Sequence, residues 1–167
     1  MNRRTTLILT LTVLLAFGAA ACELRPAPPV GGGGGASPAS VTLLGIVNAQ
    51  RSAYGLPALI WCPPLERSAQ SHAEDQAIHN TMTHVGSDGS VLSQRVTRAG
   101  YFGWSAAGEN VAANWPSGAA VMDAWMNSPG HRANILSPSF TYFGAGVGWA
   151  ANGTTYWTET FGRDGGC

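Results

Sequence analysis

The spacing of apolar residues predicts helices over most of the first two thirds of the folded region. Val41, Leu44 and Val47 recur at helical intervals, with Ser40 as the candidate N-cap and Gly55 at the end of the helix. An apolar run over 58–61 then predicts a short strand or extended segment. This first stretch is therefore interpreted as a helix followed by a brief extended segment.

A second helix is predicted to begin at Cys62-Pro63-Pro64, because prolines are tolerated in the first helical turn. Its inner face is largely alanine, which lets another layer approach closely. Ser90 is the candidate N-cap of a third helix that stops at Gly100. Residues 101–107 are aromatic and irregular, and residues 108–112 that follow place one carboxylate among small and apolar residues.

Two further helices are predicted before the chain turns to strands. One runs from about Pro116 to Met126 with Val121, Met122 and Trp125 at helical spacing. The other begins at once, with Ser128 as N-cap, and it places His131 in its first turn. Positive charge is disfavoured at a helix N-terminus, so we expect this imidazole to stay neutral.

The last part of the sequence predicts a β-hairpin. Residues 142–150 and 154–161 are rich in aromatic and β-branched side chains, and Asn152-Gly153 between them is typical of a two-residue turn. Glycines within the first of these strands indicate that helices pack tightly on the sheet. Helices followed by a hairpin favour an α+β fold with an antiparallel sheet.

The N-terminal region carries the features of an export signal and a tether. Residues 1–21 combine Arg3 and Arg4 with a short apolar core and small residues, a pattern typical of a signal peptide. The apolar run is too short for a stable membrane span. Residues 22–39 are rich in proline and glycine and are interpreted as a flexible tether, which leaves 40–167 as the folded domain.

Cys22 opens two processing routes. Ordinary cleavage after Ala21 would release a secreted protein, whereas lipidation of Cys22 would anchor the domain to a membrane as in bacterial lipoproteins. The sequence holds three cysteines, and exported proteins tend to pair their thiols. Pairing Cys62 with Cys167 would leave Cys22 for the lipid, so we expect a disulfide and a cell-surface anchor.

Charge excludes one class of partner. Without the signal the chain has seven arginines against nine acidic residues, about −2, and only 11% of the sequence is charged. No basic patch appears along the chain, so nucleic acid is not an expected partner. We expect a monomer.

Two positions stand out chemically before any relative is considered. Glu109 is a lone carboxylate among small and apolar residues, a setting in which an acid usually has a donor, cation or metal as partner. His131 in a helix start either binds a metal or acts as a base, or it only packs and hydrogen-bonds a backbone carbonyl. His72 and His79 lie on a helix with no flanking partner motif, so we interpret them as structural or surface histidines.

A series of short motifs runs from about Val41 to Gly162. They are Asn48-x-x-Arg51, Gly55-Leu56-Pro57-x-Leu59, His84 with Asp88-Gly89, Arg95 with Gly100-Tyr101, Gly108-Glu109-Asn110, Trp125-x-x-Ser128-Pro129-Gly130-His131-Arg132-x-Asn134-Ile135-Leu136, and Gly144-x-Gly146-Val147-Gly148. In order and spacing they resemble the CAP superfamily of cysteine-rich secretory proteins, antigen 5 and plant pathogenesis-related proteins, as a bacterial SCP-like extracellular domain. The resemblance implies a three-layer α–β–α sandwich with a small antiparallel sheet and a cleft on one side.

The resemblance also implies a site. In that family the cleft holds two histidines and two glutamates, which here would be His84, Glu109 and His131, with Ser128 where the second glutamate is usual. Two imidazoles and one carboxylate could hold a divalent metal such as Zn²⁺ weakly, with open positions for water. The missing carboxylate removes a general base.

Three functions follow as hypotheses. The first is an extracellular binding module for a lipid or a protein ligand, as the resemblance implies. Its aromatic residues Tyr101, Phe102, Trp104 and Trp115 either line an apolar ligand site or simply form core. The second is a metal-dependent hydrolase that uses His84, Glu109 and His131. The third is serine chemistry at Ser87 or Ser128, which no nucleophile-elbow motif supports.

Overall fold

The structure, a computed structural model, describes residues 35–167. The predicted signal peptide, the lipidation candidate Cys22 and most of the tether lie outside those residues. Within the described part, none of the helices combines the length and the apolar character needed to span a bilayer.

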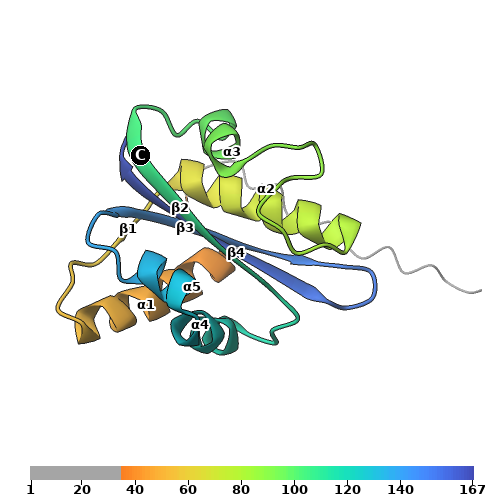
Figure 1. Cartoon of the computed structure of the whole chain (residues 1–167), viewed down its shortest axis with the longest axis horizontal. Helices are drawn as coiled ribbons and strands as arrows, with labels where there is room; N and C mark the ends of the chain where they lie inside the picture. Colours follow the sequence, from red (N-terminus) through yellow and green to blue (C-terminus); the bar gives the residue numbers. More distant parts are fainter. Residues whose placement is uncertain (1–34) are drawn as a thin grey trace, which may run out of the picture. The chain divides into compact units, whose positions relative to one another are not determined.

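The described chain forms three layers (Figure 1). Its elements are α1 (Pro38–Ala53), β1 (Ile60–Trp61), α2 (Pro63–His79), α3 (Leu92–Arg98), β2 (Trp104–Ala113), α4 (Gly118–Asn127), α5 (Pro129–Ile135), β3 (Tyr142–Trp149) and β4 (Thr155–Asp164). Helices α2 and α3 cover one face of the sheet, and α1, α4 and α5 cover the other. The predicted α–β–α sandwich is therefore confirmed.

The sheet is mixed, which corrects the expectation of a purely antiparallel one. Its strand order is β1-β3-β4-β2, with β4 antiparallel to both neighbours and β1 parallel to β3. Between β1 and β3 the chain runs through helices and β2, a connection long enough for two strands to pair in parallel. Strand β1 contributes only Ile60 and Trp61, so periodicity alone could not give its direction.

Strand β2 is the main element that the sequence pattern does not predict. It pairs with β4 along its length, with Glu109 opposite Thr160 and Asn110 opposite Glu159. Its residues from Gly108 to Ala112 are buried in succession, so side chains on both faces are covered and no alternation shows. Glu109, for which the sequence pattern indicates no secondary structure, therefore projects from a strand at the edge of the sheet.

Smaller corrections concern where helices and turns begin. Helix α1 begins at Pro38, with Ser37 as its N-cap, because proline suits the first helical position; Ser40 is instead buried inside the helix. Helix α3 begins one residue later than expected, after Val91 rather than Ser90.

The β3–β4 hairpin is present, but its turn is longer than the predicted two residues. Gly153 donates its N–H to the Ala150 carbonyl, so Ala151 and Asn152 are the central residues. Gly153 follows them with φ of 86°. The connection is a three-residue hairpin loop, in which a β-turn is followed by a glycine in the left-handed region.

The two faces of the sheet pack in different ways. Towards α1, α4 and α5 lies the main apolar core, which includes Leu43, Trp125 and Phe161. Towards α2 the strand β3 presents glycines, and a Cβ on Gly144 or Gly146 would overlap the α2 backbone. The close packing predicted from the glycine pattern is confirmed.

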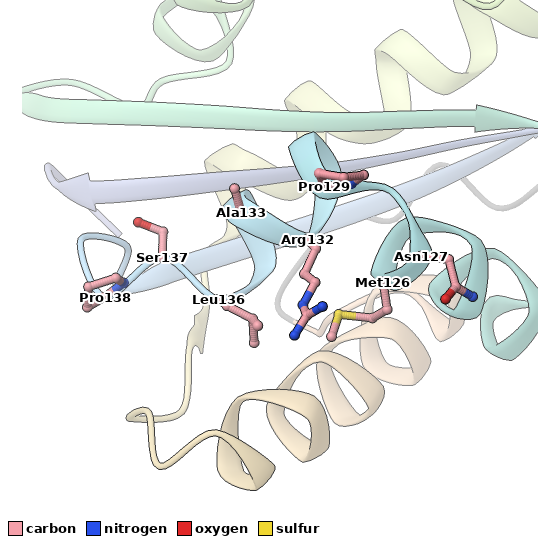
Figure 2. Close-up of a pocket in the computed structure, with 8 residues that line it drawn as sticks. All are labelled: Met126, Asn127, Pro129, Arg132, Ala133, Leu136, Ser137 and Pro138. Atoms are coloured by element: carbon pink, nitrogen blue, oxygen red, sulfur yellow. The ribbon is translucent and has the colours of Figure 1, made fainter.

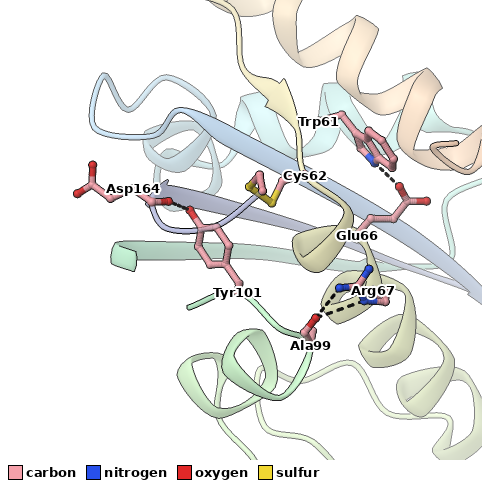
Figure 3. The surroundings of a disulfide bond; sticks show 8 residues. Trp61, Cys62, Glu66, Arg67, Ala99, Tyr101 and Asp164 are labelled. Carbon is pink, nitrogen blue, oxygen red and sulfur yellow. Dashed lines mark hydrogen bonds between the residues drawn. A yellow bond between two sulfur atoms is a disulfide. The ribbon is translucent and has the colours of Figure 1, made fainter. Parts of the chain in front are cut away.

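A disulfide joins Cys62, at the start of α2, to Cys167 across a sequence separation of 105 residues (Figure 3). Beside it Tyr101 is fully buried, and its hydroxyl donates a hydrogen bond to the Asp164 carbonyl. The chain-entropy account gives such a loop about 4–5 kcal/mol of stabilisation. The predicted pairing is therefore present, and it ties the α2 layer to the end of β4.

Arg51, near the end of α1, connects distant segments through main-chain oxygens. Its guanidinium is 1% exposed and donates to the carbonyls of Pro57 at 2.8 Å, Ile135 at 2.9 Å and Ser137 at 2.8 Å. Burial lowers the pKa of Arg51 from its ordinary value. The end of α5 is thereby fixed to the end of α1.

Candidate functional site

Glu109 lies at the centre of the candidate site, with both carboxylate oxygens engaged. Its side chain is 3% exposed and points from β2 towards the α2–α3 layer, where Arg95 Nη2 donates to Oε2 at 2.7 Å. His84 Nδ1 lies 2.9 Å from Oε1. The partner expected for this isolated acid is therefore a cation and a histidine together.

Arg95 organises the loop that carries His84. Besides Glu109, its guanidinium donates through Nη1 to the His84 carbonyl at 3.0 Å and to the Ser90 carbonyl at 2.8 Å. One guanidinium thus fixes the backbone of His84, while the carboxylate that it pairs with fixes the ring. Charge-assisted bonds of this kind are stronger than neutral ones, so the arrangement is rigid.

The His84 ring is held at one nitrogen and open at the other end. An ionised Glu109 accepts from Nδ1–H, which assigns the lone pair to Nε2. The side chain is 58% exposed, so this lone pair is available to a ligand. In metal sites, a histidine ligand commonly donates its other ring N–H to a carboxylate in this way, which fixes the orientation of the ring.

His131 approaches the same place from the opposite layer. It lies in the first turn of α5, and its carbonyl accepts a 3.0 Å hydrogen bond from Asn110 Nδ2 on β2. Burial lowers the pKa of His131, and positive charge on His84 lowers it further. The ring therefore stays neutral to lower pH than a free imidazole does. His131 is thus joined to β2 through its carbonyl, and the charge of His84 acts on its ring.

His72 lies closer to Glu109 than sequence reasoning indicated. It is 1% exposed on α2, its Nε2 is 2.8 Å from the Thr83 carbonyl, and the same atom is 3.9 Å from Glu109 Oε1. Burial lowers the pKa of His72, partly offset by the Glu109 charge. The structural interpretation holds, since the ring is neutral and supports the loop. His79 is exposed and contacts Asp75 on its own helix.

The donor set fits a metal only in part. Across residues 35–167, no group of three or more His, Cys, Asp or Glu side chains is arranged to hold a metal ion. The reason is visible at Glu109, whose oxygens are taken up by Arg95 and His84. The imidazoles of His84 and His131 remain as the available donors.

The serine candidates are not placed for nucleophilic chemistry. The Ser87 hydroxyl donates to the Asp75 carboxylate, not to a histidine, and Ser128 is the residue that precedes α5. A serine nucleophile needs a base that takes its proton.

A separate groove of about 530 Å³ runs along α4 and α5 (Figure 2). It is lined by Met126, Asn127, Pro129, Arg132, Ala133, Leu136, Ser137 and Pro138. The four aromatic residues considered for an apolar site do not line it. Tyr101 is core, and Phe102 is 64% exposed.

Glu159, which sequence reasoning does not single out, is a second buried carboxylate behind the site. It is fully buried on β4, its Oε1 accepts from Asn110 Nδ2 at 2.7 Å, and its Oε2 has no hydrogen-bond partner. Burial raises the pKa of Glu159 to about 8, against the opposing effect of the Asn110 hydrogen bond. The group is therefore mostly protonated at neutral pH.

Comparison with known proteins places this geometry in a family. The profile of the cysteine-rich secretory protein family, CAP, matches residues 44–161. The uncharacterized membrane protein YlbC of Bacillus subtilis is 34% identical over 119 residues, which are 71% of this chain and 33% of that protein. The uncharacterized protein YkwD of the same organism is 34% identical over 116 residues, or 70% and 44% of the two chains. The chain thus spans less than half the length of these relatives.

Solved structures agree on the fold. An extracellular protein containing an SCP domain from Bacillus anthracis is 30% identical with a TM-score of 0.66, covering 79% of this chain and 45% of the other. An outer surface protein from Borrelia burgdorferi is 21% identical with a TM-score of 0.68, covering 74% and 90%, a likeness of fold alone. With the family profile spanning most of the described residues, the chain belongs to the cysteine-rich secretory protein (CAP) family.

Proposed function

We propose that this chain is an exported binding module that acts outside a bacterial cell, with the His84–Glu109–His131 cleft as its ligand-facing site. The sequence of residues 1–21 supports export, and relatives carry the names of an extracellular protein and a membrane protein. Anchoring through a lipid on Cys22 is part of this proposal. Intact-mass measurement tests it, since a mature protein with unmodified Cys22 would exclude the lipid.

The observation that carries the proposal is the engagement of Glu109. A general base needs a free carboxylate, but this one is 3% exposed and accepts from Arg95 and His84. Its role is to orient His84, whose ring is presented to solvent. A rigid, oriented imidazole beside a second neutral imidazole suits recognition better than proton transfer.

A divalent ion such as Zn²⁺ is the ligand that this pair fits best. His84 through Nε2 and His131 through its ring would hold it, with Glu109 behind His84. Two imidazoles make a weak, open site, because structural zinc sites use four protein ligands. A bound ion would supply coordination positions for water or for an anionic group of a partner.

The proposal extends to a lipid or protein ligand beyond the ion. The groove of about 530 Å³ on the other side of α5 lies in the size range of small-ligand sites. Met126, Ala133 and Leu136 supply its apolar surface, and Arg132 lies among them. An apolar chain with an acidic end would match this lining.

Metal-dependent hydrolysis by His84, Glu109 and His131 is the alternative. It would require water on the ion and a base to activate it. The hydrogen bond between Glu109 and His84 is the feature that favours it, since a carboxylate–histidine pair can accept a proton. Zinc-dependent ester hydrolysis lost in a His84→Ala variant would establish it over simple binding.

Calorimetric titration with zinc tests the site. We expect wild-type protein to bind about one Zn²⁺ at a pH of about 7.5, and His131→Ala to bind about tenfold or more weakly. Binding should fade as pH falls, because a protonated imidazole cannot ligate. The lowered pKa of His131 delays that loss to more acidic pH.

His79→Ala is the matched control, since His79 is exposed on α2 and contacts only Asp75 of its helix. It should bind zinc as wild type does. Equal binding by wild type and His131→Ala would place the ion elsewhere. No binding by either would leave the cluster as a hydrogen-bonded scaffold and exclude the metal.

A further inference from the structure

A second, smaller pocket lies between α2 and α3, outside the histidine cleft. Its volume is about 240 Å³, and its lining consists of Arg67, Ser68, Ser71, Arg95, Arg98 and Ala99. Three of the seven arginines in 22–167 therefore meet at one small opening, together with two hydroxyl groups and no carboxylate. The pocket is smaller than the roughly 300–1,000 Å³ of sites for drug-sized ligands, so it suits a small group.

Two of the lining residues hold buried polar atoms without a partner. Arg95 Nε and Ser68 Oγ make no hydrogen bond, although their residues are only 7% and 3% exposed. The two terminal nitrogens of Arg95 are already engaged by Glu109, His84 and Ser90. Because the great majority of buried polar atoms have a partner, two unmet donors in one pocket indicate an absent acceptor.

The charge around the pocket is positive. Arg67 lies across its rim and donates to the Ala99 carbonyl through Nη2 at 2.8 Å, a neutral partner (Figure 3). Arg98 pairs with Asp88 at 2.8 Å, but that pair is exposed and therefore weak. Arg95 is balanced by Glu109 on the far side of its guanidinium. Among the residues that the structure describes, Arg67 thus has no acidic partner at the pocket's rim.

We propose that this pocket binds a phosphate group, either as the free ion or as a phosphomonoester. Guanidinium groups match phosphate oxygens through directed, charge-assisted hydrogen bonds, and serine hydroxyls add neutral donors. A tetrahedral dianion offers more acceptor positions than a carboxylate, which suits a pocket with three arginines and two serines. The Nε of Arg95 and the hydroxyl of Ser68 are closed to solvent in the structure, so a small movement of the lining side chains would let the phosphate supply the acceptors that they lack.

This site and the histidine cleft share one side chain. Arg95 faces Glu109 with its terminal nitrogens and lines the phosphate pocket as well. The phosphate proposal does not depend on the metal proposal, because none of the pocket residues is a proposed zinc donor.

Titration of the full-length protein with inorganic phosphate, in a phosphate-free buffer at constant ionic strength, tests the proposal by NMR. We expect a saturable shift of the Arg95 Nε–H resonance. Arg67→Gln should bind about tenfold more weakly, because one charge-assisted donor is lost. Arg163→Gln is the matched control: it removes the same charge from an exposed residue at the end of β4 and should bind as wild type does.

Ser68→Ala separates ligand binding from folding. Removing a buried hydroxyl without a partner should raise the melting temperature of the free protein, yet weaken phosphate binding by about threefold. Glycerol 3-phosphate distinguishes the two sources of the group: binding equal to inorganic phosphate assigns the site to a phosphomonoester on a larger molecule, and weaker binding assigns it to the free ion. No saturable shift, unchanged binding in both pocket variants, or an equal loss in Arg163→Gln would overturn the proposal.

Discussion

Glu109 and Glu159 are buried carboxylates on neighbouring strands, but they project from opposite faces of the sheet. On the α2–α3 face, Glu109 accepts from Arg95 and His84. On the α1–α4–α5 face, Glu159 has Asn110 as its partner and one oxygen without any. Glu159 lies opposite Asn110, the residue next to Glu109, so the two acids are close in the sheet. Their hydrogen-bond partners nevertheless differ.

The surroundings of each carboxylate determine its role in the protein. Arg95 donates a charge-assisted hydrogen bond to Glu109, and the same carboxylate fixes the ring of His84. Burial around Glu159 favours the neutral acid, which is why its pKa rises to about 8. The first carboxylate holds Arg95 and His84, whereas the second remains inside the core as a neutral hydrogen-bonding group.

Removing the cation from the first acid is expected to have the largest effect. Arg95→Met leaves a nearly buried carboxylate without its cation, with His84 as its remaining partner, and frees the carbonyls of His84 and Ser90. Breaking a buried pair in this way costs about 3–5 kcal/mol of unfolding free energy. Urea denaturation measures the loss, and adding Glu109→Gln should restore much of it. A loss below about 1 kcal/mol would show that solvent already screens the pair.

The packing of the two faces offers a second, smaller test. Gly146→Ala would place a Cβ on the backbone of α2 at Gln70, so we expect a loss of about 2–3 kcal/mol from overpacking. Gly130→Ala, on α5 with open space around it, is the control and should be neutral or slightly stabilising. Denaturation midpoints compare them. Equal effects would mean that the α2 layer shifts to accept the methyl group.

The smallest expected effect concerns the neutral acid. Glu159→Gln keeps the shape and the hydrogen bond to Asn110 and removes the proton equilibrium. We expect it to stabilise the protein by about 2 kcal/mol near neutral pH, because the wild-type group must hold a proton that the unfolded chain releases.

The sign follows from the raised pKa. Below the ordinary value of 4.5 both folded and unfolded states are protonated, so the variant should match wild type. Between that value and about 8 the folded state alone keeps the proton, so wild-type stability falls as pH rises. Unfolding experiments at the two ends of this range and at its middle should show the two proteins diverging. Parallel profiles would mean that Glu159 ionises inside the fold.

Much of the fold follows from local patterns in the sequence. Helix starts are predicted by proline and serine. Close packing of a helix on the sheet is predicted by alanine along α2 and glycine along β3, and the layered fold follows from these two predictions. Strand β2 is not predictable in this way because buried residues on both of its faces give no alternation. The direction of β1 is not predictable because two residues carry no topological information.

The site is predictable to a lesser extent. An isolated acid among apolar residues indicates that Glu109 needs a partner, and the same argument applied to Glu159 would find it. The closeness of His72 to Glu109 is not predictable, since it depends on how α2 lies against β2. Arg95 appears in a motif, but its link to Glu109 spans fourteen residues across two elements.

The guanidinium of Arg51 has a consequence for motion. It is solvated by main-chain oxygens from two segments instead of by water, and Ile135 lies 84 residues away from it in the chain. If either segment opens, a buried cation loses its hydrogen-bond acceptors, so neither can open at low free energy without the other. The loop after α1 and the end of α5 therefore form one cooperative unit in native-state amide exchange. Since α5 also carries His131, a residue on the first helix of the domain restrains the helix that holds this histidine.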